Sequence, residues 1–157
     1  MPLNPSSLAN DLKNIDGSLS EHQSAQQYAQ ALSKFFDSAM GPGGSTVMSA
    51  SGMSNFSQMV EGVYKQKGTV QTCASQIASA AATWASSFQI FGGAFGTSIV
   101  IVAIPSSLST GLSSAWSGGS KSTVTNSEAQ AWLTFCQSII ASGTGVTPAP
   151  PVAGPLS

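Results

Sequence analysis

The sequence lacks arginine altogether, has a single histidine, and carries few charged residues of either sign. Charged residues make up 7% of the 157 residues, against about 25% in a typical soluble chain. The formal net charge is −1. Binding to nucleic acid needs a basic patch that releases counterions, and attachment to anionic lipid also needs basic residues. The composition therefore argues against specific nucleic-acid binding and against electrostatic attachment to a membrane.

Residues for acid–base and metal chemistry are equally scarce. His22 stands on the polar side of a predicted helix, where a surface role fits better than a catalytic one. Cys73 and Cys136 are far apart and fall on apolar helix faces, which suits small buried side chains rather than a disulfide framework or zinc. The six carboxylates are scattered, and no phosphate- or dinucleotide-binding motif is present. We therefore predict no enzyme activity, no catalytic or cofactor-binding residue, no cofactor and no metal site.

What the sequence does have is helical periodicity. Apolar residues recur at helical intervals over residues 6–15, 20–39, 54–88, 105–116 and 126–142. Gly68 either divides the third segment or only weakens it, since glycine costs about 1 kcal/mol relative to alanine. Composition predicts loops at residues 45–55 and 117–125, and Gly143 is expected to end the last helix. The candidate N-caps are Ser6 or Ser7, Ser18 or Ser20, and Thr125 or Asn126.

One uncharged stretch, FQIFGGAFGTSIVIVAIP at Phe88–Pro105, raises the question of a membrane span. It is at the short limit for a span, its glycines divide it, and neither lysine nor an aromatic belt flanks it. In water, the glycines suggest a loop and the apolar run at residues 98–104 suggests one strand or two helical turns, covered on both faces. We therefore expect this stretch to be buried by protein rather than by lipid.

The last residues, 146–157, are rich in proline, which is typical of an extended tail. We predict one helical domain over residues 1–145, followed by this tail. The predicted fold class is all-α, a bundle of four to six helices with extended N- and C-terminal arms and room for one short strand near 98–104.

Two of the predicted helices share their apolar spacing. Any two amphipathic helices can do so, and we infer no duplication from the match. The matching sets are Ala25, Tyr28, Ala29, Leu32, Phe35 and Phe36 against Ala129, Trp132, Leu133, Cys136, Ile139 and Ile140.

The segment AWSGG at 115–119 contains the W-x-G tripeptide of small secreted helical-hairpin proteins. In those proteins the tripeptide joins two long amphipathic helices, whereas here it ends a short predicted helix in a longer chain. This resemblance supplies the alternative function, a secreted or membrane-active helical protein such as a toxin or a W-x-G-like effector.

The order of segments also resembles another class of protein. The segment SEHQSAQQYAQALSKFFDSA is followed by an Ala/Ser-rich helix ending in AATWASSF, a Gly-rich apolar stretch, the helix TNSEAQAWLTFCQSIIAS and the Pro-rich tail. This is similar to small virion structural proteins of tailed bacteriophages, found at the neck, the tail or the head–tail junction. The resemblance implies a non-enzymatic structural subunit of the virion, assembled in the host cytoplasm. Its expected partners are further copies of the chain in a ring or shell and other virion proteins, with low charge suiting close packing.

Overall fold

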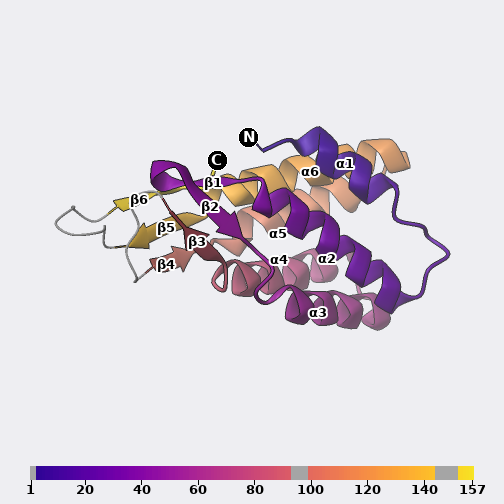
Figure 1. The fold of residues 1–157 in the computed structure, drawn as a ribbon. Coiled ribbons are helices and arrows are strands. Elements are labelled where there is room, and N and C mark those ends of the chain that lie inside the picture. The colour runs from indigo at the N-terminus through magenta and orange to yellow at the C-terminus, as the bar shows by residue number, and fades with distance from the viewer. Residues whose placement is uncertain (1–2, 93–98, 144–151) are drawn as a thin grey trace.

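Helices form the body of the protein, and short strands gather at one end of the helical bundle (Figure 1). This computed structural model describes residues 3–92, 99–143 and 152–157. Its helices are α1 (Pro5–Lys13), α2 (Glu21–Asp37), α3 (Met53–Gln66), α4 (Val70–Ala85), α5 (Pro105–Trp116) and α6 (Lys121–Ser138). Its strands are β1 (Met40–Gly41), β2 (Ser45–Met48), β3 (Gln89–Phe91), β4 (Ile99–Val102), β5 (Ile140–Gly143) and β6 (Val152–Pro155), and a short 3-10 turn, η1 (Pro42–Gly44), links β1 to β2. The predicted all-α bundle is confirmed.

The N-termini of the helices are fixed by side-chain caps. Ser20 caps α2 as expected, and its hydroxyl and the Gln23 side chain form a reciprocal capping box. The expectation for α1 was wrong, because Asn4 accepts the first backbone N–H groups and Pro5 begins the helix. For α6, the cap is Ser120 rather than Thr125 or Asn126. The Ser/Thr-rich start of α6 resembles a loop in composition, but it forms a regular, exposed helical turn.

Strand formation was the less predictable part of the fold. The short strand expected near 98–104 is confirmed as β4. Within the predicted loop at 45–55, however, Ser45–Met48 form β2, and α6 ends at Ser138 so that β5 occupies the residues up to Gly143. Gly68 lies in a true break between α3 and α4, where Lys67 adopts a left-handed conformation with φ 46°. These strands are short, and pairing with distant segments stabilises them more than their own sequence does.

The proline-rich segment is described only in its last part. Residues 152–155 form β6 against β5, and Leu156 is buried in the core. The earlier part of the predicted tail, 146–151, and the glycine-rich residues 93–98 lie outside the described residues.

The elements repeat in the same order three times. Unit 1 is α1, α2, β1 and β2, unit 2 is α3, α4, β3 and β4, and unit 3 is α5, α6, β5 and β6. In the second helix of each unit, the N-cap hydroxyl accepts the backbone N–H three residues later, and the N-caps are Ser20, Thr69 and Ser120. At the C-terminal end of each of these helices a serine hydroxyl donates at 2.6 Å to the carbonyl three residues earlier, and the serines are Ser38, Ser87 and Ser138.

Burial follows the same repeat. Residues 70–89 and 121–140 have an identical order of buried, half-buried and exposed positions, and residues 21–40 differ from them at one step only. The structure therefore pairs Ala29 with Ala129, four residues away from the match suggested by apolar spacing alone. Under this alignment Tyr28, Ile77 and Glu128 occupy equivalent positions in α2, α4 and α6.

The three units close into a ring. Each helix packs against its neighbours along the chain, and α6 also packs against α1. Antiparallel pairing joins β2 to β3 and β4 to β5, which links each unit to the next. Ser157, just after β6, exchanges backbone hydrogen bonds of 2.6 and 2.9 Å with Met40 in β1. The same kind of link therefore connects unit 3 back to unit 1.

Aromatic side chains fill the space inside this ring. Phe36 is fully buried, and its ring meets Trp84 and Trp132 edge-on with centroids 5.4 and 6.0 Å apart. Phe56 stacks on Trp84 at 4.6 Å. Since Trp132 has no exposed surface, its predicted place in the core is confirmed.

Candidate functional site

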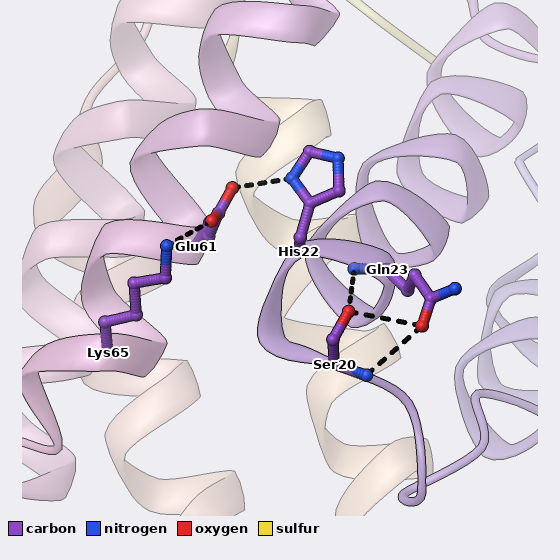
Figure 2. Close-up of polar contacts among 5 residues, drawn as sticks. All are labelled: Ser20, His22, Gln23, Glu61 and Lys65. Carbon is purple, nitrogen blue, oxygen red and sulfur yellow. Dashed lines mark hydrogen bonds and ion pairs between the residues drawn. The ribbon is translucent and has the colours of Figure 1, made fainter.

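The single histidine lies in a polar cluster on the surface, between α2 and α3 (Figure 2). His22 Nδ1 is 2.7 Å from Glu61 Oε2, and Lys65 Nζ donates to Glu61 Oε1 at 2.5 Å. The hydrogen bonds from Lys65 and His22 hold the pKa of the Glu61 carboxyl below its usual value. The His22 side chain is 56% exposed, and exposed ion pairs of this kind contribute little to stability. The cluster joins the first turn of α2 to α3.

The two cysteines do not form a site. Both are free, Cys136 buried and Cys73 half-buried. Burial raises the pKa of the Cys136 thiol to about 12, which makes it an inert apolar side chain. Across the described ranges, no three His, Cys, Asp or Glu side chains come together as a metal site would require.

Glu128 is the polar residue that the sequence reasoning missed. It lies in α6 and is only 6% exposed. Tyr28 Oη donates to its Oε1 at 2.5 Å, and Trp116 Nε1 donates to its Oε2 at 3.0 Å. Trp132 Nε1 in turn donates to Tyr28 Oη at 3.1 Å. Three aromatic side chains thus hold one carboxyl inside the bundle.

Burial dominates the electrostatics of this group. Loss of solvation raises the pKa of the Glu128 carboxyl, while the hydrogen bonds from Tyr28 and Trp116, together with the nearby Trp132 N–H, act in the opposite direction. Burial also raises the pKa of Tyr28 and Tyr64, and the nearby Glu128 adds to both shifts. None of the ion pairs among the described residues includes Glu128. The carboxyl therefore has hydrogen-bond donors but no partner of opposite charge in that part of the chain.

A cavity of about 420 Å³ opens beside this carboxyl, and we call it the Glu128 cavity. All six helices, or the residues just after them, contribute to its wall. Its lining includes Ile15 and Gly68, which follow α1 and α3. The connections between α1 and α2 and between α3 and α4 lie at the opposite end of the bundle from the strands (Figure 1). The lining residues are Leu12, Ile15, Tyr28, Tyr64, Gly68, Val70, Cys73, Ile77, Trp116, Thr125 and Glu128.

A sequence signal for Glu128 did exist. The helix expected over residues 126–142 has Glu128 in its first turn, where an acidic side chain suits the helix dipole. With α6 beginning at Lys121, Glu128 falls in the second turn, one step before Ala129 and four before Trp132 on the buried stripe. The W-x-G tryptophan, Trp116, ends α5 and contributes one of the two hydrogen bonds to this carboxylate.

None of the helices in the described ranges combines the length and hydropathy that crossing a bilayer needs. No protein-family model, no curated protein and no solved structure matches the chain.

Proposed function

We propose that this protein is a non-enzymatic structural subunit of a bacteriophage particle, assembling by subunit–subunit packing at the neck, the tail or the head–tail junction. Its place is the virion, assembled in the host cytoplasm. Its partners are further copies of the chain, in a ring or shell, and other virion structural proteins. The phage setting is supported by the resemblance in the order of segments, and the assembly role is supported by the surface described next.

The observation that carries the assembly role is an apolar surface at the strand end of the molecule. Most of the large exposed hydrophobic residues in the described ranges lie on the strands or directly after them, and we call this group the strand-end surface. Val102 and Ile140 face each other across the β4–β5 pair, and each is about half exposed. Its members are Met40, Met48, Phe91, Val102, Ile104 and Ile140.

A second copy of the chain is the occupant that fits this surface best. The described strands carry no Lys, Asp or Glu, so the surface offers apolar contact and backbone pairing but no charge to select a charged partner. Exposed apolar patches on soluble domains mark interaction sites, and low charge favours close packing of like surfaces. The three units also carry their short strands at the same end of the molecule. This arrangement favours the same kind of contact being repeated between copies of the chain.

The test is the mass in solution, measured by light scattering, with two matched double variants. Met48→Lys with Val102→Lys changes the strand-end surface, whereas Met59→Lys with Val70→Lys changes an exposed Met and an exposed Val on helices. We expect the wild type and the helix variant to assemble and the strand variant to dissociate while keeping its circular dichroism spectrum.

A wild-type chain that stays monomeric, alone and when mixed with the virion proteins encoded beside it, would contradict the proposal. Release of dye from lipid vesicles by the wild type, lost in the strand variant, would instead favour the membrane-active alternative.

A further inference from the structure

The Glu128 cavity has the chemistry of a ligand site that the assembly role does not use. Each oxygen of Glu128 accepts one hydrogen bond, from Tyr28 or from Trp116. A carboxylate offers about four acceptor positions, so acceptor capacity remains after these two bonds. Burial opposes ionisation of this carboxyl and the two donors favour it, and no ion pair among the described residues supplies a positive charge that would stabilise the carboxylate.

The wall of the cavity adds a second feature that suits a positive charge. The side chains of Tyr28, Tyr64 and Trp116 line it together with Glu128. Aromatic rings attract ammonium groups through their negative faces, and the attraction grows when the cation is removed from water. Aliphatic residues complete the wall, so a ligand here would meet both a charged and an apolar surface; they are Leu12, Ile15, Val70 and Ile77.

Size sets a further limit on the ligand. At about 420 Å³ the cavity is near the lower end of the range of known ligand pockets, about 300–1,000 Å³. We propose that the Glu128 cavity binds a small organic cation, a protonated alkylamine whose ammonium group pairs with Glu128 and whose alkyl chain lies against the aliphatic wall. Such a ligand supplies the positive charge that the buried carboxyl lacks, and it offsets the cost of burying that charge.

Isothermal titration calorimetry with n-butylammonium chloride tests this directly. n-Butanol is the neutral probe of similar shape, and sodium chloride keeps the ionic strength constant. We expect the wild type to bind n-butylammonium at least tenfold more tightly than n-butanol, and Glu128→Gln to lose at least tenfold in affinity for the cation. Glu61→Gln removes an exposed carboxylate of the same charge and should bind as the wild type does.

A second variant covers the case in which Glu128→Gln does not fold. Cys73 is half-buried in the cavity wall and forms no hydrogen bond to the carboxyl, so Cys73→Leu should fill the space while leaving the hydrogen bonds to Glu128 in place. We expect this variant to keep its fold and to lose cation binding. Three results would overturn the proposal: no binding by the wild type at tens of millimolar, equal affinity for n-butanol, or unchanged affinity in a folded Glu128→Gln or Cys73→Leu variant.

Discussion

Helices α2 and α6 bury equivalent positions along their length with one exception, and at one of the shared buried positions they have chemically different side chains. At equivalent positions, α2 has Tyr28 and α6 has Glu128, and the two side chains are hydrogen-bonded to each other. The third equivalent helix, α4, has Ile77 there, which lines the same cavity. The repeated architecture requires only that the side chain at this position be buried, whatever its chemistry. A phenol, a carboxyl and an alkyl group therefore meet at one end of a ring whose backbone repeats.

The largest difference between the helices lies one turn further along, where α6 has Trp132, α2 has Leu32 and α4 has Ala81. Trp132→Ala should lower the free energy of unfolding by about 3–5 kcal/mol, because it leaves a cavity among packed aromatic rings. Urea denaturation provides the measurement. The exposed Gln130→Ala on the same helix is the control, and a loss below about 1 kcal/mol for Trp132→Ala would contradict its role in the core.

The stability of the protein as a function of pH tests how Glu128 differs from Tyr28 and Ile77, its uncharged equivalents in α2 and α4. Because burial raises the pKa of Glu128 in the folded protein above its unfolded value of 4.5, the folded state holds the proton more tightly. The raised pKa therefore contributes to the stability of the folded state. This contribution is fully present below the unfolded pKa and is lost as the pH rises through the folded pKa. Relative to Glu128→Gln, the wild type should lose stability above pH 4.5, at no more than about 1.4 kcal/mol per pH unit.

Urea denaturation of both proteins between acidic and neutral pH would measure this slope. The lowered pKa values of Glu61 and Asp16 are common to both proteins and cancel in the difference. A stability difference that stays flat, or that grows in favour of the wild type with rising pH, would contradict a pKa of Glu128 that is higher in the folded protein than in the unfolded chain.

Substitutions at two glycines, Gly111 in α5 and Gly62 in α3, test how closely each helix is packed at that point. A Cβ at Gly111 would lie 2.7 Å from Ala131 Cβ, so α5 and α6 touch at this point. Gly111→Ala should cost about 1–3 kcal/mol through overpacking. At Gly62 nothing lies within 4 Å of an added Cβ, so Gly62→Ala should stabilise α3 by about 0.5–1 kcal/mol. Thermal unfolding of the two variants should shift in opposite directions, and a shared direction would refute the close approach of α5 and α6.

The caps test how far the three units are equivalent. Ser20→Ala, Thr69→Ala and Ser120→Ala each remove one hydrogen bond to a backbone N–H at a helix start. We expect a loss of about 1 kcal/mol in each case. Urea denaturation measures the free energy of unfolding of each variant. If it fell for one variant and stayed unchanged for the other two, the three caps would not stabilise their units equally.

The sequence predicts the helices well because long apolar stripes repeat at the helical period, as in α2 with Leu32 and Phe36. Apart from β4, the strands escape prediction because two to four residues carry little pattern, and part of their pairing comes from the next unit, as Val47 pairs with Ile90. The start of α6 lies earlier than predicted, at Lys121, so that Glu128 falls beyond the first turn and on the buried face of the helix. The Glu128 cavity was beyond prediction, since its wall exists only when all six helices are in place.

The hydrogen bonds between Met40 and Ser157 connect residues that are 117 positions apart, and the packing of α6 on α1 spans a similar distance. Contacts of this kind slow folding, because a long loop must be closed before they form. Until unit 3 arrives, β1 presents an open edge and α1 an uncovered apolar face, both of which invite association with other chains. We therefore expect refolding to be slow for a helical protein and sensitive to protein concentration.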